Sequence, residues 1–285
     1  MMYPKSIQWS YDILDSFWSV VRLLKESRFV RVKKINREHE SCIIMGNGPS
    51  LSNTLKANAD NLQHHDLIAV NFAALADEFL LYKPNTYVLC DPAFWFQPDS
   101  EDPESSLQKV NRFYRHLAEN VTWNMQLFIP FQAKKIVTEM NVLSRNPRVS
   151  VCYFNRTKIE GFKCLKHAML KRQWGMFRTQ NVIVAALLLA IYSNYKDVYL
   201  AGLDFDWTKN LRVDENNDVC FSDNHFYAKT DRKMSQAMYE TYYSLYCAHA
   251  SFYNIKNYAE TAGVNIFNLN KQSFVNCFEK KDKIL

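Results

Sequence analysis

Seven short runs of apolar residues recur along this chain, and most are apolar at every position rather than at alternate ones. They lie at 42–45, 67–71, 86–90, 126–129, 149–153, 197–201 and 264–267. A strand that is apolar on both faces must be covered on both, which is typical of a parallel sheet between two layers of helices. Helical spacing fills the intervals, at 73–82, 104–119, 131–140, 180–194 and 233–261. The alternation predicts an α/β fold with an open, mostly parallel, Rossmann-like sheet and helices on both faces.

Two helical segments carry patterns that indicate their place in this fold. Residues 180–194 are apolar nearly all round, which predicts a helix buried at the centre. In the last helical segment five tyrosines recur at helical spacing, and we expect this stripe to pack against the protein. They are Tyr239, Tyr242, Tyr243, Tyr246 and Tyr253.

The cysteines indicate the redox environment. The chain has seven cysteines, an odd number, and no C-x-x-C pair. This pattern predicts neither a disulfide framework nor a cysteine zinc site. A reducing cytoplasmic compartment is the natural expectation.

The net charge of +6 is concentrated near the N-terminus. The stretch from Arg22 to Arg37 has seven basic residues and one acidic residue, so its net positive charge equals that of the whole chain. The remainder is neutral, which argues against a nucleic-acid-binding protein. Just before this stretch, apolar residues from Tyr11 to Leu24 fall at helical spacing. We therefore expect an amphipathic, basic helical segment at 1–40 and the main domain at 41–285.

The N-terminal segment has two interpretations. An apolar stripe that runs into a basic cluster is typical of a helix lying on an anionic membrane surface. The alternative is a helix packed on the core, with its basic edge in solvent. The sequence has no signal-peptide pattern and no apolar run of ~18 or more residues that could span a bilayer. We therefore expect a cytoplasmic protein, peripheral to the inner membrane.

Glycines and polar residues follow the predicted strands at the edge where doubly wound sheets bind ligands. In chain order these candidates are Gly46, Asn47, Gly48, Pro49, Ser50, Asn71, Asp91, Gly202, Asp204 and Asp206. Glycines let backbone N–H groups approach a phosphate, and a following helix N-terminus favours negative charge. Neither G-x-G-x-x-G nor G-K-[ST] is present, so this is no dinucleotide fingerprint and no Walker A loop. Taken alone, Asn47 is equally well explained as a left-handed turn residue.

Residues 203–232 break the alternation of strands and helices. They are polar and lack both periodicities over most of their length. A long structureless segment inside a compact domain is usually functional, and this one starts at the ligand-binding edge, so we expect a lid. It contains His225, whose imidazole is a credible general base near neutral pH.

Five sequence elements occur in an order that resembles a known family. "GNGPSL" follows the first strand, Asn71 closes the second, and "DPAFWF", "YKDVYLAGLDF" and "DNHFY" come after them. From about Cys42 to the C-terminus the chain resembles the bacterial sialyltransferases of glycosyltransferase family 42, which modify lipooligosaccharide and capsule. A related group, shared by a pterin diphosphokinase and flagellin-modifying proteins, carries a similar glycine turn. The resemblance implies a GT-A-like variant of the Rossmann-like sheet.

The resemblance also implies roles for the candidate residues. Asn47 would hold the donor phosphate, Asn71 would contact the donor sugar, and Asp204 would lie beside the ribose. His225 would deprotonate the acceptor hydroxyl. The donor site would be completed by the glycine turn, Asp91, Arg178, Gln180, Asn181, Gly202 and Asp206. A nucleoside monophosphate donor needs neither a Walker lysine nor magnesium, so we expect no cofactor.

Three positions depart from the family pattern on the donor side. The family has asparagine where Asp91 stands, a Thr-Ser pair near residues 180–181, and tyrosine where Asp206 stands. The sequence at 204–206 also spells D-x-D, the metal-binding element of many transferases that use nucleotide-diphosphate sugars. In that alternative, Asp204 and Asp206 would hold a metal ion.

We therefore expect an inverting glycosyltransferase that moves sialic acid, or a related acidic ulosonate, from a CMP-activated donor to a glycan hydroxyl. The expected process is the synthesis of surface polysaccharide or lipooligosaccharide. Two alternatives stay open. One is a metal-dependent transferase that uses a nucleotide-diphosphate sugar, and the other is a diphosphokinase-like or non-catalytic domain in cell-surface assembly. The expected partners are the CMP-sugar, a glycan acceptor and an anionic membrane surface, and the chain could form a homo-oligomer.

Overall fold

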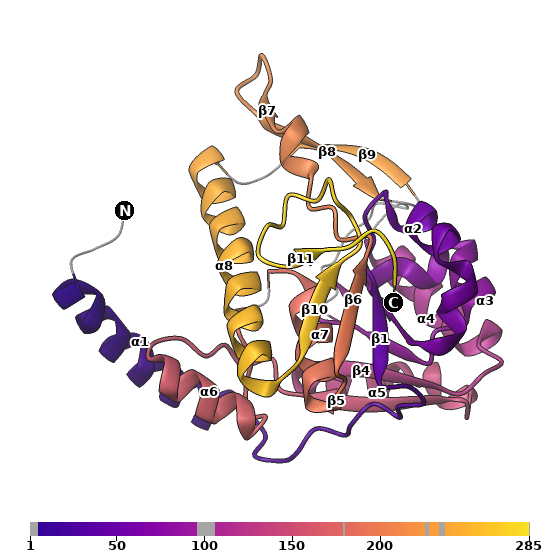
Figure 1. Ribbon diagram of the computed structural model, residues 1–285, viewed down its shortest axis with the longest axis horizontal. Helices are drawn as coiled ribbons and strands as arrows, with labels where there is room; N and C mark the ends of the chain where they lie inside the picture. Colours follow the sequence, from indigo (N-terminus) through magenta and orange to yellow (C-terminus); the bar gives the residue numbers. More distant parts are fainter. Residues whose placement is uncertain (1–4, 96–105, 179, 226–227, 234–236, 285) are drawn as a thin grey trace.

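The computed structural model describes residues 5–95, 106–178, 180–225, 228–233 and 237–284, with only the backbone given at 5–7, 106–107, 207, 210, 221–225 and 228–233. At the centre of the protein lies an eight-stranded sheet of order β11-β10-β6-β1-β2-β3-β4-β5, shown in Figure 1. All its neighbouring strands pair in parallel, which confirms the predicted open α/β sheet. The strands are β1 (Ser41–Met45), β2 (Asp66–Val70), β3 (Thr86–Val88), β4 (Met125–Pro130), β5 (Val149–Phe154), β6 (Asp197–Ala201), β10 (Asn265–Asn268) and β11 (Glu279–Lys280).

Helices cover both faces of the sheet (Figure 1). Along β1, Cys42 and Ile44 belong to one apolar core, whereas Ile43 and Met45 belong to the other. A strand buried in this way has to be apolar throughout. The first core contains α7 (Val182–Tyr192) and the inner side of α8 (Met238–Ala262). The second contains residues of α2 (Leu51–Ala57), α3 (Asp77–Tyr82), α4 (Ser106–Asn120) and α5 (Lys134–Met140).

Burial confirms the prediction for α7 and contradicts the one for the tyrosines of α8. Every residue from Ile183 to Ile191 in α7 is buried. In α8, however, Tyr239 and Tyr246 are 74% and 69% exposed, and the other three tyrosines are exposed too. The helix packs instead through residues such as Phe252 and Ile255, which are fully buried. Helical spacing shows which residues share a side of a helix, but an amphipathic residue such as tyrosine does not reveal which side turns inward.

The segment 203–232 is not structureless, contrary to the prediction. It holds a 3₁₀ turn (Trp207–Asn210) and an antiparallel sheet of β7 (Arg212–Val213), β8 (Val219–His225) and β9 (Ala228–Lys233). Antiparallel pairing satisfies the backbone hydrogen bonds whatever the polarity of the side chains. These strands can therefore form without an apolar pattern in the sequence. Figure 1 shows this small sheet beyond the carboxyl end of β6. Its function as a lid stays a prediction.

The N-terminal helix α1 (Lys5–Glu26) and the chain that follows it are attached to the main domain. Val32 and Ile35 are 6% and 4% exposed and belong to the same core as α7. The backbone N–H of Ile35 donates to the Ser193 hydroxyl at 2.8 Å. The second half of the 1–40 segment therefore packs with the domain that was expected to begin at residue 41.

Candidate functional site

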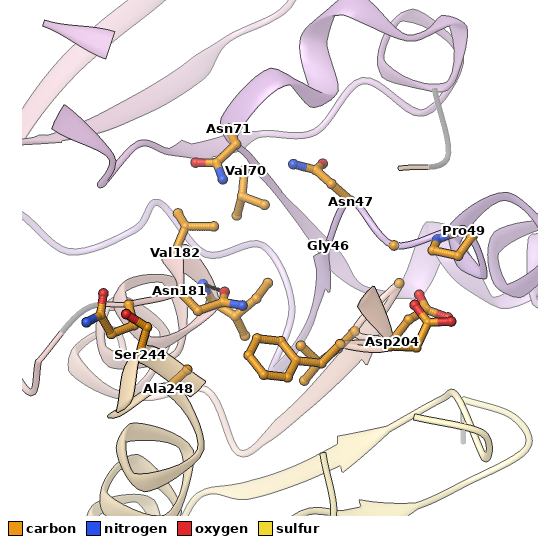
Figure 2. A pocket seen from close by; sticks show the side chains of 17 residues that line it. Gly46, Asn47, Pro49, Val70, Asn71, Asn181, Val182, Asp204, Ser244 and Ala248 are labelled. Atoms are coloured by element: carbon orange, nitrogen blue, oxygen red, sulfur yellow. Dashed lines mark hydrogen bonds between the residues drawn. The ribbon is translucent and has the colours of Figure 1, made fainter. Parts of the chain in front are cut away.

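The order of the strands reverses between β1 and β6. From β1 the chain adds β2 to β5 on one side, and then places β6 and β10 on the other. Ligands in this class of fold bind outside the carboxyl ends of the strands at such a switch point. A pocket of about 270 Å³ lies there. Figure 2 shows its walls, which are the turns after β1 and β6, the end of β2, the start of α7 and part of α8.

The glycine turn after β1 packs directly against the turn after β6. The N–H of Gly46 donates to the Ala201 carbonyl at 2.7 Å, and the N–H of Gly48 donates to the Gly202 carbonyl at 2.9 Å. A Cβ atom on Gly46 would lie 2.5 Å from the Gly202 oxygen, and Gly202 itself has a left-handed φ of +70°. The glycines thus permit close contact between two turns. The expectation that these N–H groups bind a phosphate needs correction, because both already donate within the protein.

Asp204 joins three segments beneath the pocket. One carboxylate oxygen accepts hydrogen bonds from the hydroxyl and the N–H of Ser50, at 2.9 and 3.3 Å. The other accepts one from the Asn270 side chain at 2.6 Å. Asp204 is only 7% exposed, and burial raises the pKa of its carboxyl, against the opposing effect of the Ser50 hydrogen bonds. A Cβ atom on Gly48 would lie 1.9 Å from this carboxylate, which explains the second glycine.

Asn71 is held in an unusual conformation at the end of β2. Its backbone is left-handed, with a φ of +50°. The Tyr87 hydroxyl donates to the Asn71 carbonyl and accepts from the N–H of Ala74, which fixes this turn. The side-chain oxygen of Asn71 is buried and has no hydrogen-bond partner among the described residues. Figure 2 shows the Asn47 amide turned toward that of Asn71. An amide can both donate and accept hydrogen bonds, so a polar ligand in the pocket could bond to the Asn71 side chain.

The amino end of α7 forms the opposite wall. Asn181 caps the helix, since its side-chain oxygen accepts from the N–H of Ile183 at 2.8 Å. Gln180 lines the pocket beside it. The partial positive charge at a helix N-terminus favours an anion such as a phosphate. The predicted residues 180 and 181 thus lie where an anionic ligand would be stabilised.

Asp206 lines the pocket but is paired. Its carboxylate lies 3.3 Å from the Lys209 ammonium. A metal ion at the D-x-D sequence would compete with Lys209 for Asp206, and with Ser50 and Asn270 for Asp204. This bonding favours the metal-independent alternative.

Three predicted residues with described side chains do not line this pocket. Ser50 lies behind the turn, where it binds Asp204. Asp91 lines a neighbouring cavity. Arg178 donates to the Tyr243 hydroxyl at 3.2 Å, in a cleft between α1 and α8. The side chain of His225 lies outside the described residues, although its backbone ends β8.

Sequence reasoning missed two residues that shape the pocket. Asn270 binds Asp204 from 66 positions away, and Tyr87 fixes the turn at Asn71. Asn270 falls in the stretch "VNIFNLNKQSFVNCF", and nothing in that stretch indicates its partner. Tyr87 lies in a buried strand, where its hydroxyl has to find a polar partner.

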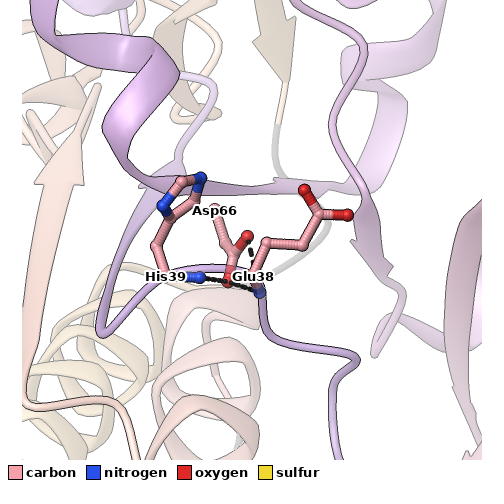
Figure 3. A group of neighbouring side chains, drawn as sticks. All are labelled: Glu38, His39 and Asp66. Atoms are coloured by element: carbon pink, nitrogen blue, oxygen red, sulfur yellow. Dashed lines mark hydrogen bonds between the residues drawn. The ribbon is translucent and has the colours of Figure 1, made fainter.

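A second group of side chains, away from this pocket, satisfies the geometric requirement for a metal site. It consists of Glu38, His39 and Asp66 (Figure 3). Asp66 is 2% exposed and already accepts hydrogen bonds from four donors. They come from the N–H groups of Glu38 and His39 at 3.0 and 3.3 Å, the Asn85 amide at 2.9 Å and the Tyr195 hydroxyl at 2.7 Å. The carboxylate thus acts as a clamp that ties the chain before β1 to β2.

Comparison with known proteins gives likenesses of fold. No protein-family model and no curated protein matches the sequence. The structure is similar to the MAf glycosyltransferase from Magnetospirillum magneticum AMB-1, with a TM-score of 0.51 and a sequence identity of 11%. The match covers 94% of this chain but only 37% of the length of that protein. The structure is also similar to the monofunctional α-2,3-sialyltransferase Cst-I from Campylobacter jejuni, with a TM-score of 0.46 and 15% identity over 88% of this chain and 83% of that one. The Magnetospirillum likeness supports the α/β fold described above.

Proposed function

We propose that this chain is a glycosyltransferase whose donor is a CMP-linked sialic acid or a related acidic ulosonate. The observation that carries the proposal is the placement of two asparagine side chains, Asn47 and Asn71, at the switch point of the sheet and beside the N-terminus of α7. Amide groups and a helix N-terminus can bind a single phosphate without a lysine. The shared fold with a glycosyltransferase supports the reaction class by analogy.

The proposed reaction is a direct displacement at the anomeric carbon of the donor sugar. The acceptor hydroxyl oxygen forms a bond to this carbon while the bond to the phosphate oxygen breaks. The hydroxyl proton passes to His225, and CMP leaves with the bonding electron pair. Asn47, Asn71 and the N-terminus of α7 would stabilise the charge that develops on the departing phosphate. Attack from the face opposite the phosphate inverts the configuration.

A panel of nucleotide sugars tests this proposal. With CMP-sialic acid and a set of oligosaccharide acceptors, the purified protein is expected to release CMP. EDTA is expected to leave the rate unchanged, because no proposed step uses a metal ion. Release of UDP or GDP from a nucleotide-diphosphate sugar, abolished by EDTA and restored by manganese, would instead support a metal site at Asp204 and Asp206.

The N-terminal helix presents its apolar side to solvent. It packs through its polar side, where the Ser16 and Ser19 hydroxyls accept from the N–H groups of Phe162 and Glu160 at 3.0 and 2.8 Å. In Figure 1, α1 runs beside α6 (Lys163–Lys171) at the edge of the molecule. The exposed apolar side chains are Trp9, Tyr11, Ile13, Leu14, Phe17, Trp18, Val20, Val21 and Leu24. An apolar surface of this extent marks an interaction site.

We propose that this apolar side of α1 binds the surface of an anionic membrane from the cytoplasm. The basic residues that follow are exposed: Lys25, Arg28, Arg31, Lys33, Lys34 and Arg37. Each contributes roughly 1 kcal/mol near an anionic surface, and tryptophan favours the lipid–water boundary. No helix within the described residues is long and apolar enough to cross a bilayer. The contact would bring the enzyme to acceptors at the membrane.

Co-sedimentation with lipid vesicles measures this contact. The protein is expected to bind phosphatidylcholine vesicles that contain phosphatidylglycerol, and to bind less at high salt because salt screens surface charges. Replacing Phe17 and Trp18 together with serine is expected to abolish most of the binding. Leu81→Ser is the matched control, since Leu81 is 70% exposed on α3.

Two results would contradict the membrane proposal. Equal binding to pure phosphatidylcholine would remove its electrostatic part. Dimerisation in solution that the Phe17 and Trp18 substitutions abolish would assign the apolar side of α1 to a second copy of the chain.

A further inference from the structure

A second cavity adjoins the donor pocket. It has a volume of about 300 Å³ and shares Asn71, Gln180 and Asn181 with that pocket. Its other walls include Asp91, after β3, and Arg156, after β5. Because the two cavities share lining residues, they lie next to each other, within the reach of one nucleotide-linked sugar.

Arg156 supplies a positive charge to this second cavity. The chain next to it is fixed, because the buried amide of Asn155 donates to the carbonyls of Arg28 and Gln173 at 2.7 and 2.8 Å. The Nε atom of Arg156 is buried and has no hydrogen-bond partner in the part of the chain that the structure describes. Its guanidinium forms no ion pair with any residue that the structure describes. The cavity thus contains a cation whose donors have no acceptor among the described residues.

The surroundings of Arg156 favour an anionic ligand. A buried donor without an acceptor is costly, and a guanidinium does not lose its proton to avoid that cost. The N-terminus of α7, at Gln180 and Asn181, adds positive potential to the same cavity. Asp91 also lines this cavity, but it is exposed, and it accepts from the N–H of Ala93 at 3.0 Å rather than pairing with Arg156. Its other oxygen can accept from a sugar hydroxyl.

We propose that Arg156 binds the carboxylate of the donor sugar through two parallel N–H···O hydrogen bonds. The inference rests on the proposed function, because it requires a nucleotide-linked sugar acid in the donor pocket. It assigns the second cavity to the sugar and the first to the nucleotide. Asn71, common to both, lies between the phosphate and the sugar. Arg156 is then the residue that distinguishes an acidic donor sugar from a neutral one.

Calorimetric titration with CMP and with CMP-sialic acid tests this assignment, because CMP has the phosphate but no sugar carboxylate. Arg156→Gln is expected to weaken the binding of CMP-sialic acid roughly 10- to 100-fold, the typical effect of losing a charge-assisted pair. Its affinity for CMP is expected to stay unchanged. Arg156→Lys keeps the charge but not the paired donors, so it is expected to recover part of the loss. Arg145→Gln, at an exposed arginine before β5, is the matched control and is expected to change neither affinity.

The outcomes separate this inference from the proposed function. Equal weakening of both ligands by Arg156→Gln would overturn the inference, because the guanidinium would then bind the phosphate. An unchanged affinity of Arg156→Gln for CMP-sialic acid would overturn it too, while the proposed function would stand. If the wild-type protein bound neither ligand, both would fail. Circular dichroism of each variant shows whether the fold is retained.

Discussion

Replacing Asp66 with alanine is expected to lower the free energy of unfolding by about 3–5 kcal/mol, as typically follows the loss of a buried hydrogen-bond network. The carboxylate accepts from the N–H groups of Glu38 and His39, from Asn85 and from Tyr195. Alanine would leave these donors without an acceptor at the amino end of the sheet. Urea denaturation followed by circular dichroism measures the loss.

Glu38→Ala is the matched control for Asp66→Ala. It keeps the backbone N–H that Asp66 accepts and removes only an exposed side chain, so its expected effect is within about 0.5 kcal/mol. If the alanine variant at Asp66 is too unstable to purify, Asp66→Asn retains one acceptor oxygen and should show a smaller loss in the same direction. Wild-type stability in both Asp66 variants would show that the clamp contributes nothing.

Replacing His225 with alanine is expected to lower kcat about 10²–10⁴-fold, the usual effect of losing a general base. The affinity for CMP-sialic acid is expected to stay unchanged, because the proposed base acts on the acceptor. The backbone of His225 ends β8, opposite Ala228 in the hairpin. This hairpin follows the turn after β6, which forms one wall of the pocket at the switch point of the sheet. CMP release in the presence of acceptor measures kcat, and calorimetry measures donor affinity.

His64→Ala, at an exposed histidine in the connection before β2, is the control for His225→Ala. Wild-type turnover in His225→Ala would exclude it as the base. A parallel loss of donor binding would instead make it a binding residue.

The sheet could be predicted because burial on both faces requires an apolar residue at every position. The run at 197–201 coincides with β6, and the run at 42–45 misses only the first residue of β1. The buried α7 follows from the same physical cause. The strands β7 to β9 were missed because their residues show no apolar alternation in the sequence, while antiparallel pairing satisfies the backbone hydrogen bonds without one.

The location of the site was predictable, whereas its internal hydrogen bonds were not. The turns after β1 and β6 must meet if these strands are neighbours in a parallel sheet. That Asp204 accepts hydrogen bonds from Ser50 and Asn270 depends on side-chain directions that no local pattern encodes. The glycine at position 46 likewise indicates that another group approaches the backbone closely. The sequence does not show that this group is the carbonyl of Gly202.

The position of β1 between β2 and β6 affects how the chain acquires its fold during synthesis. β2 follows β1 closely in the sequence, but β6 is made only after more than half of the chain has been added. Until then one edge of β1 has no partner, and an open apolar edge can pair with other chains. Pairing between such distant segments is also slow. The central strand of the sheet is thus the first to be translated and among the last to be enclosed.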